Sequence, residues 1–227
     1  MSNIEWTDET CNPITGCKKV SPGCANGYAE SIAKRFWGER KFTDVQFHPD
    51  RLKQPLKWRK PRMVFVNSMS DLFHDSVTDE QLDQMFAVMA LTPQHTYQVL
   101  TKRPDRMLDY FDTDVETLRT RWVNASISME AWEGIGQMSA WTEIVNAGWP
   151  LPNVWLGCTV ENQATADHRI PLLLQTPSAV RFLSCEPLLE EIDISEFLNN
   201  FTELRFRPYR RFAGAPVGLR ILGNRRR

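Results

Sequence analysis

The sequence lacks several features that would assign its class directly. It contains no run of 18 or more apolar residues, which excludes a helix that crosses a membrane, and we expect no membrane partner. The first residues form neither a basic region nor an apolar stretch, so the sequence predicts no signal peptide and a cytoplasmic location. The 227 residues, 42% of them hydrophobic, are enough to bury a full core without disulfide support.

The sequence also lacks any Cys-x-x-Cys pair, a spacing typical of zinc and iron–sulfur sites. Its five cysteines are an odd number in a long chain, which argues against a secreted disulfide framework. Three of them, Cys11, Cys17 and Cys24, lie within the first 24 residues, among turn-forming Gly and Pro residues. Two thiols cannot saturate zinc or a four-iron cluster, and the four histidines lack metal-ligand spacing to the cysteines. Cys11 is one candidate for a third ligand, and Cys158 or Cys185 are others if the ends of their strands face the loop. The alternative is that these cysteines are small buried hydrophobic residues.

Lysine is absent from residues 203–227, which hold eight arginines and one acidic residue. Because the whole chain has a net charge of −1, this tail carries +7 and the rest of the chain −8. Such a tail is typical either of an arm that binds nucleic-acid phosphates or of a solvated, disordered terminus, and the second interpretation is favoured. We therefore expect one α/β domain over residues 1–202 and a basic, disordered tail over 203–227.

Short apolar runs alternate with helical patterns along the chain. The runs rich in strand-forming residues are 63–69, 97–101, 154–160 and 179–185. Each is nearly continuous in its apolar residues, as strands buried on both faces are. The helical patterns lie at 79–91, after Thr78 as the candidate N-cap, near 115–122, near 129–147 and at 162–175. The alternation predicts a parallel α/β sheet, either open or closed into a barrel.

Polar side chains follow each of the four predicted strands. The clusters are 67–71 with His74 and Asp75, 101–103, 161–162 and 184–186. Ligands of parallel α/β folds bind at the carboxyl ends of the strands, so we expect these clusters to meet at one binding face. Five of the eight tryptophans lie in residues 122–155, where core packing is favoured over a stacking platform for a base or a cofactor.

These motifs together resemble a known family. The strings CNPITGCKKVSPGCANGYAE, FVNSMSDLFH, QVLTKRP, LGCTVENQATADHRIPLLLQ and RFLSCEPLL are similar to those of phage and prophage proteins of the gene-product-thirty-seven/sixty-eight family, a domain of unknown function. The similarity extends over about residues 4–192. The three-cysteine loop of that family is in turn similar to the loop of radical S-adenosylmethionine enzymes.

The resemblance implies a partial TIM-like barrel of the radical-S-adenosylmethionine type. Three thiolates would hold a [4Fe–4S] cluster, and the fourth iron would bind S-adenosylmethionine. Reduction would release a 5′-deoxyadenosyl radical that takes hydrogen from a substrate, so the cofactor would carry the chemistry. A phage protein of this kind would act in the cytoplasm of the host cell.

The resemblance and the strand-end clusters together assign expected roles. The expected cluster ligands are Cys17, Cys24 and, as a substitute third ligand, Cys11. The residues expected to bind the cofactor are Tyr28, Asn67, Ser68, Glu161 and Glu186. The residues expected to face the substrate, and so to be catalytic, are Asp71, His74, Lys102 and Arg103.

Two departures from the family pattern weaken the expected chemistry. Gly27 occupies the third ligand position, and Cys11 occupies a position that is usually tryptophan. After SCEPLL the family continues with another strand and a glycine-rich turn, whereas this chain does not, so we expect a barrel that is incomplete at its C-terminal end. The edge at 179–185 would then be exposed.

The expected function is therefore that of a phage-type radical-S-adenosylmethionine-like iron–sulfur protein whose catalytic competence is impaired. It would be an enzyme only if the cluster assembles. The alternative is a nucleic-acid-binding accessory protein that uses the arginine-rich tail without catalysis.

Overall fold

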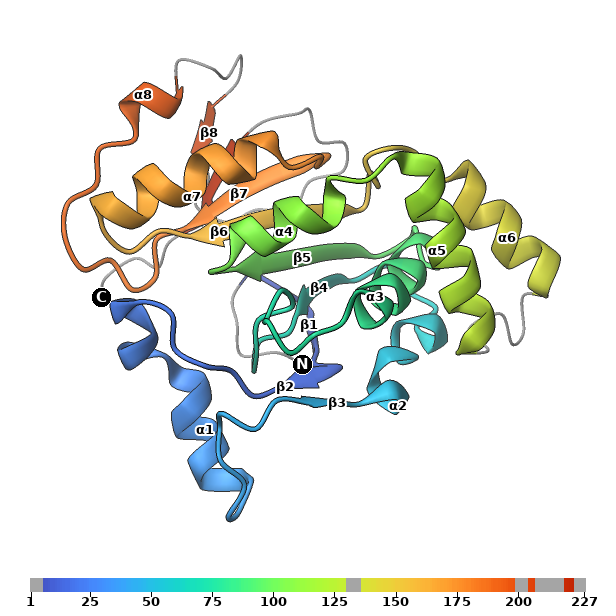
Figure 1. Ribbon diagram of the computed structural model, residues 1–227, viewed down its shortest axis with the longest axis horizontal. Coiled ribbons are helices and arrows are strands. Elements are labelled where there is room, and N and C mark those ends of the chain that lie inside the picture. Colours follow the sequence, from blue (N-terminus) through green and yellow to red (C-terminus); the bar gives the residue numbers. More distant parts are fainter. Residues whose placement is uncertain (1–5, 130–135, 199–203, 207–218, 223–227) are drawn as a thin grey trace.

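A seven-stranded parallel sheet forms the centre of the structure, a computed structural model that describes residues 6–129, 136–198, 204–206 and 219–222 (Figure 1). The strands lie in the order β1-β4-β5-β6-β7-β9-β8, and every neighbouring pair is parallel. Their bounds are β1 Glu9–Cys11, β4 Met63–Val66, β5 Thr96–Thr101, β6 Val154–Thr159, β7 Val180–Ser184, β8 Leu204–Phe206 and β9 Leu219–Leu222. A separate antiparallel pair joins β2 (Ile14–Thr15) to β3 (Gln46–Phe47).

The sheet is open, with β1 at one edge and β8 at the other. The predicted parallel α/β class is therefore confirmed, and the sheet does not close into a barrel. The prediction of an exposed edge at 179–185 was wrong, because β9 pairs with β7 along residues 181–184. Nothing in the family motifs indicated that pairing, since β9 lies within the arginine-rich tail.

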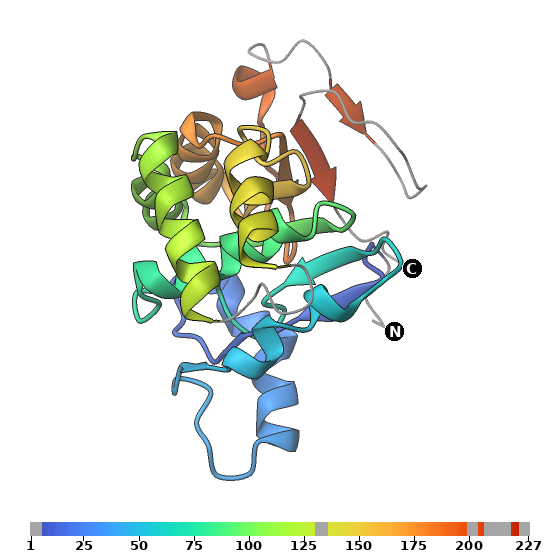
Figure 2. The same ribbon diagram turned by 90° about the vertical axis from the view of Figure 1, so that its right-hand side faces the viewer.

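Helices connect the parallel strands and cover one face of the sheet (Figure 2). The longer ones are α3 Asp79–Leu91, α4 Pro104–Phe111, α5 Val115–Ser128, α6 Gln137–Asn146 and α7 Gln163–Gln175. The helix α3 begins where the sequence predicts, because the Thr78 side chain accepts a hydrogen bond from the Gln81 amide while the Gln81 side chain accepts one from the Thr78 amide. In the same way Asn162 caps α7. No helix within the described ranges is long and apolar enough to cross a membrane.

The core beneath these helices is rich in aromatic rings. Phe86 of α3 stacks on Tyr110 of α4 and on Trp122 of α5, with ring centroids 5.3 and 5.7 Å apart. Trp149 packs against Trp122 at 6.2 Å. The core interpretation of the tryptophan-rich segment is thus confirmed for Trp122 and Trp149, while Trp132 lies outside the described residues.

A lobe formed by residues 16–45 projects from the body between β2 and β3. It contains the short 3-10 helix η1 (Pro22–Asn26) and the helix α1 (Tyr28–Phe36), which lies below the sheet in Figure 1. The chain then returns through α2 (Pro49–Leu52) and η2 (Pro55–Lys57) to the start of β4. The lobe matters for function because its first half carries Cys17 and Cys24.

The C-terminal tail is described only at β8 and β9, after the short helix α8 (Ser195–Leu198). The rest of 203–227 lies outside the described residues, and so do six of its eight arginines; Arg205 lies in β8 and Arg220 in β9. The predicted disorder of the tail and its proposed role in binding nucleic acid therefore stay predictions.

Candidate functional site

A cavity of about 600 Å³ lies at the carboxyl ends of the parallel strands. Residues from the ends of four strands line it, namely Asn67, Thr101, Thr159 and Ser184, together with the cysteine loop of the lobe. Its volume falls in the range of sites that hold a cofactor or a drug-sized molecule. The predicted convergence of the strand-end clusters on one face is therefore confirmed.

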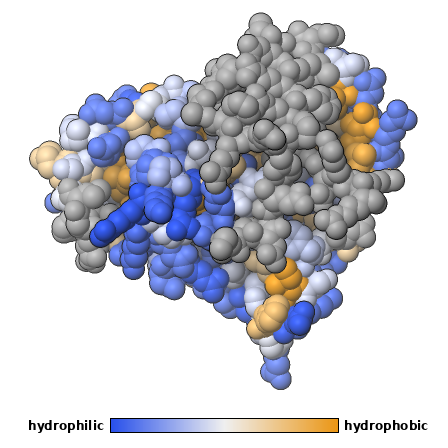
Figure 3. Space-filling model, turned by 180° about the vertical axis from the view of Figure 1, so that it is seen from behind, coloured by the Kyte–Doolittle hydropathy of each residue, from blue (hydrophilic) through white to orange (hydrophobic). Residues whose placement is uncertain are grey.

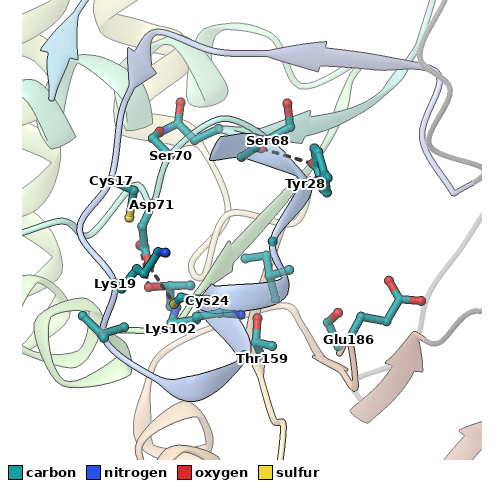
Figure 4. A pocket seen from close by; sticks show the side chains of 18 of the residues that line it. Cys17, Lys19, Cys24, Tyr28, Ser68, Ser70, Asp71, Lys102, Thr159 and Glu186 are labelled. Atoms are coloured by element: carbon teal, nitrogen blue, oxygen red, sulfur yellow. Dashed lines mark hydrogen bonds between the residues drawn. The ribbon is translucent and has the colours of Figure 1, made fainter. Parts of the chain in front are cut away.

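Two thiols of the cysteine loop line this cavity. Cys17 and Cys24 lie on the same side of it, and Asp71 and Lys102 lie close to them in Figure 4. Gly27, at the third position of the loop, also lines the cavity. The loop thus brings all three positions of the motif to one place, but only two of them carry sulfur.

Glu161 holds the cysteine loop against the end of β6. Its carboxylate is fully buried and accepts hydrogen bonds from the Ser21 hydroxyl at 2.8 Å and the Gly23 amide at 3.2 Å. Lys102 Nζ lies 3.0 Å from Oε1 of the same carboxylate. Glycine at position 23 leaves room for this carboxylate, because a Cβ there would lie 2.3 Å from Glu161 Cδ and would displace the side chain from its hydrogen bonds.

Asp71 organises the wall of the cavity beyond β4 and β5. Its Oδ1 accepts the Thr101 hydroxyl at 2.7 Å, and its Oδ2 accepts the Lys102 amide at 2.9 Å and Arg103 Nη1 at 3.2 Å. Arg103 continues to the cysteine loop, where Nη2 donates to the Lys18 carbonyl at 3.1 Å and Nη1 lies 3.7 Å from Cys17 Sγ. One carboxylate therefore fixes both the strand end and the guanidinium that contacts the first thiol.

The two thiols differ in acidity. Burial raises the pKa of Cys17, with a further contribution from the negative charge of Asp71 that Arg103 opposes. Burial also disfavours ionisation of Cys24, but hydrogen bonds from Val20 and Ser21 and the positive charge of Lys102 outweigh it, so the pKa of Cys24 is lowered. Cys24 is therefore the more reactive thiol of the pair.

The wall opposite the cysteines is polar and partly strained. Asn67 follows β4 with a φ of 58°, a left-handed conformation that asparagine tolerates better than most residues. Its Oδ1 accepts a hydrogen bond from the Ile14 amide at 3.3 Å, while its buried Nδ2 has no hydrogen-bond partner among the described residues. The Ser68 carbonyl accepts a hydrogen bond from the Tyr28 hydroxyl at 3.1 Å, which connects the start of α1 to the end of β4.

Glu186 brings a carboxylate to the rim of the cavity after β7. It is exposed, and it forms no ion pair with any residue that the structure describes. Burial raises the pKa of the Tyr28 phenol, and the nearby charge of Glu186 adds to this effect. A carboxylate without a partner beside an aromatic ring suits a cationic group of a ligand.

Most of the residues singled out from the sequence line the cavity. They are Cys17, Cys24, Tyr28, Asn67, Ser68, Asp71, Lys102, Arg103 and Glu186. The structure places them at one site but does not test the individual roles that we expect for them.

Three of the predicted site residues do not line the cavity. Cys11 is buried in the core at the end of β1, where its Sγ lies 3.7 Å from the Arg51 carbonyl and burial raises the pKa of the thiol to about 12. His74 is fully buried, and its two ring nitrogens face the amides of Lys18 and Ser76 at 3.3 and 3.0 Å. Glu161 lies behind the cysteine loop that it anchors. In the structure these three side chains lie behind the lining of the cavity, and the roles expected for them stay predictions.

Sequence reasoning missed several residues that line the cavity. Trp6, Phe42 and Phe65 contribute apolar wall, and Lys18 contributes a charge. Phe65 lies within a strand and Phe42 within the lobe, and neither position follows a strand end. Only the approach of the lobe to the sheet brings these residues together, and no local pattern in the sequence encodes that approach.

The residues present do not fit a [4Fe–4S] cluster of the kind that the resemblance implies. Such a cluster needs three thiolates from the loop, and the cavity offers Cys17 and Cys24 alone. Cys158 is buried in the core, and Cys185 packs against it. Within the described parts of the chain, no group of three or more His, Cys, Asp or Glu side chains is placed to hold a metal ion.

Comparison with known proteins gives one match. A family model described as protein of unknown function (DUF5131) matches residues 1–204. No curated protein and no solved structure matches the chain. The matched range includes the cysteine loop, the strand ends and every residue of the cavity.

Proposed function

Since the chain belongs to the family of proteins of unknown function named DUF5131, we propose its function from the site itself. The cavity binds S-adenosylmethionine or a close relative, a nucleoside joined to a charged amino-acid group. The site as it stands does not support radical chemistry, because the cavity offers two thiols where three are required. The observation that carries this proposal is a nucleotide-sized cavity that joins the strand ends to the cysteine loop.

The charges around the cavity support a ligand that carries both signs. Lys18, Lys102 and Arg103 contribute positive charge at the cysteine side, although the last two are paired with carboxylates. Glu186 contributes a carboxylate at the opposite rim that has no ion-pair partner within the part of the chain that the structure describes. A ligand with a carboxylate near Lys18 and a cationic centre near Glu186 would meet complementary charge at each end.

The order of the strands supports the assignment to a radical-S-adenosylmethionine-like fold. The strands β1, β4, β5, β6 and β7 follow one another in the sheet as they do in the chain, as in the first part of a TIM-like barrel. The cysteine loop follows the first of them, at the carboxyl edge. The resemblance of the loop motif, together with this placement, is the basis for the assignment.

The test is isothermal titration calorimetry with S-adenosylmethionine on the full chain, without iron. We expect binding of S-adenosylmethionine and weaker binding of 5′-methylthioadenosine, which lacks the amino-acid group. Glu186→Gln removes the rim carboxylate and is expected to weaken S-adenosylmethionine binding about tenfold, the effect of losing one charged contact. Glu191→Gln, an exposed acid beyond the cavity, is the matched control.

The proposal fails if S-adenosylmethionine produces no binding heat. It also fails if the two substitutions weaken binding equally, because the rim carboxylate would then have no specific part in recognition.

A further inference from the structure

The segment 51–62 is the most strongly charged stretch among the residues that the structure describes. It contains Arg51, Lys53, Lys57, Arg59, Lys60 and Arg62 and no acidic residue. The segment therefore carries +6 in a chain whose net charge is −1, so all other residues together carry −7. It is separate from the arginine-rich tail, and it does not contribute to the cavity.

Five of these six cations have no counter-charge within the described protein. Arg62 pairs with Glu9 and lies over the Trp58 ring at 5.1 Å, which fixes it at the start of β4. The other five form no ion pair with any residue in the described ranges. The acid nearest along the chain is Asp50, directly before the segment. Asp8 lies beside the end of the segment in space, and its carboxylate accepts a hydrogen bond from the Met63 amide.

The fold presents these charges on a firm support. Leu52 and Pro55 are buried, and Leu56 and Trp58 pack against the core, so the apolar residues of the segment face inward. His95 lies beneath, with its ring 5.6 Å from Trp58 and its Nε2 3.2 Å from the Pro55 carbonyl. Lys57, Arg59 and Lys60 are exposed on the outer side.

The surface is visible from behind the molecule. Figure 3 shows this face, on which strongly hydrophilic residues cover much of the left-hand part. Like charges held together without partners repel one another, so the fold maintains this arrangement at a cost in stability. A polyanion bound to the surface would remove that cost.

We propose that the segment 51–62 is a docking surface for the phosphate backbone of a nucleic acid. A membrane surface is a poorer fit, because the segment exposes no large hydrophobic residue that could insert among lipids. A protein partner is a poorer fit as well, because protein interfaces depend on central aromatic anchors, and Trp58 is turned into the core. Phosphates bind to lysine and arginine through charge alone, without such anchors.

The position of the surface separates it from the ligand cavity. Arg62 precedes β4, whereas Asn67, which lines the cavity, follows it. A strand of four residues spans about 13 Å, so the two sites lie at opposite ends of the same strand. Nucleic acid bound at 51–62 therefore leaves the cavity open, and the inference stands whether or not the cavity binds S-adenosylmethionine.

Fluorescence anisotropy with a labelled oligonucleotide, as duplex DNA and as single-stranded RNA, tests the proposal on the full chain. If five phosphate contacts form, the affinity for duplex DNA should fall about 500-fold as the salt concentration rises from about 50 to about 200 mM. The triple variant Lys57→Glu, Arg59→Glu, Lys60→Glu is expected to weaken binding at least tenfold and to reduce the salt slope by about 3. Circular dichroism confirms that each variant is folded.

Two controls locate the binding surface. The variant Lys34→Glu, Arg35→Glu, Lys41→Glu makes the same change in net charge on the exposed side of the lobe. The variant Arg225→Ser, Arg226→Ser, Arg227→Ser tests the tail. We expect the affinity of both controls for nucleic acid to stay within about threefold of that of the unaltered chain. Salt screens charges that lie far from the bound phosphates, so their loss has little effect.

Three results would overturn the proposal. The first is the absence of binding at low salt to either nucleic acid. The second is an equal loss of affinity in the lobe or tail control, which would assign binding to overall charge or to the tail. The third is binding to phosphatidylserine vesicles in place of nucleic acid, which would identify a membrane surface as the partner.

Discussion

Gly27 decides the chemistry of the site at the scale of a single residue. Its backbone angles, φ −72° and ψ 136°, are accessible to any residue, so the position does not require glycine. A Cβ at this position would meet only the Cys24 carbonyl, at an ordinary contact distance of 3.5 Å. The loop therefore has room for a third thiol that the sequence does not supply.

Restoring that thiol is expected to restore the metal site. After anaerobic reconstitution with iron and sulfide, we expect Gly27→Cys to hold about four iron ions per chain and the unaltered chain far fewer. Iron quantitation and electron paramagnetic resonance of the reduced protein make the comparison. Cys11→Ala in the Gly27→Cys background is the control, and its iron content should be unchanged because Cys11 lies in the core. Loss of iron in that control would show that Cys11 is a ligand after all.

Four of the five thiols should also differ in reactivity, because their surroundings differ. With iodoacetamide on the folded protein, we expect Cys24 to be modified first, Cys17 more slowly, and Cys11 and Cys158 last. The lowered pKa of Cys24 means that its rate should reach its plateau at a lower pH than an ordinary thiol, whereas the raised pKa of Cys17 shifts its profile to higher pH. Mass spectrometry of tryptic peptides at several pH values measures both profiles. Identical profiles for Cys17 and Cys24 would contradict the electrostatic difference described above.

At the scale of elements, Glu161 joins β6 to the cysteine loop and to the segment after β7. Its side chain binds the loop, and its carbonyl accepts the Leu189 amide at 2.8 Å. Burial disfavours the charged carboxylate, but the Ser21 hydrogen bond and the charge of Lys102 outweigh it, so the pKa of Glu161 is lowered. Because the folded-state pKa is below the unfolded value, the stabilisation is present above the ordinary glutamate range and is lost as pH falls through the folded value.

The substitution Glu161→Gln should remove this stabilisation. We expect a loss of about 2 kcal/mol in the free energy of unfolding at neutral pH, because Lys102 is left without its partner while the amide still accepts hydrogen bonds. The difference from the unaltered chain should shrink as the pH is lowered, since protonation removes the same charge there. Urea denaturation at neutral and acid pH measures both quantities. A difference that is independent of pH would mean that the charge of Glu161 contributes nothing to stability.

The sequence predicts the elements better than it predicts their contacts. The four apolar runs correspond to β4, β5, β6 and β7, and their positions place Asp71, Lys102 and Arg103 at the cavity. A strand buried on both faces leaves a nearly continuous apolar run, and this local property is visible without a structure. Glu161 and His74 follow strands in the same way, yet both turn inward to hold the lobe. The sequence alone does not distinguish a polar residue that faces a ligand from one that faces a loop folded over it.

The strands β1 and β9 show a second limit of the sequence. The strand β1 is three residues long and β9 has four residues within an arginine-rich segment, so neither shows a strong strand pattern. Their pairing is decided by the neighbours β4 and β7, which present open edges to them. Long-range pairing therefore overrides weak local preference at both sides of the four central strands, β4 to β7.

At the scale of the whole molecule, the basic segment 51–62 and the ligand cavity lie at opposite ends of the strands of the sheet. The cavity lies at the carboxyl ends of the strands, and the basic segment 51–62 precedes the amino end of β4. The short strand between them is buried and packed into the core. A ligand at one end and a polyanion at the other would therefore meet the same rigid element without competing for space.

The order of the central strands also has a consequence for how the protein is made. Each of β4, β5, β6 and β7 pairs with the sheet strand that precedes it in the chain. A ribosome releases the N-terminal part first, so every new strand emerges when its partner is already available. The sheet can then grow by one strand at a time during synthesis, without waiting for a distant segment. The cysteine loop, which follows β1, is the exception: its anchor Glu161 emerges almost 140 residues later, so the site takes its final form only when β6 has left the ribosome.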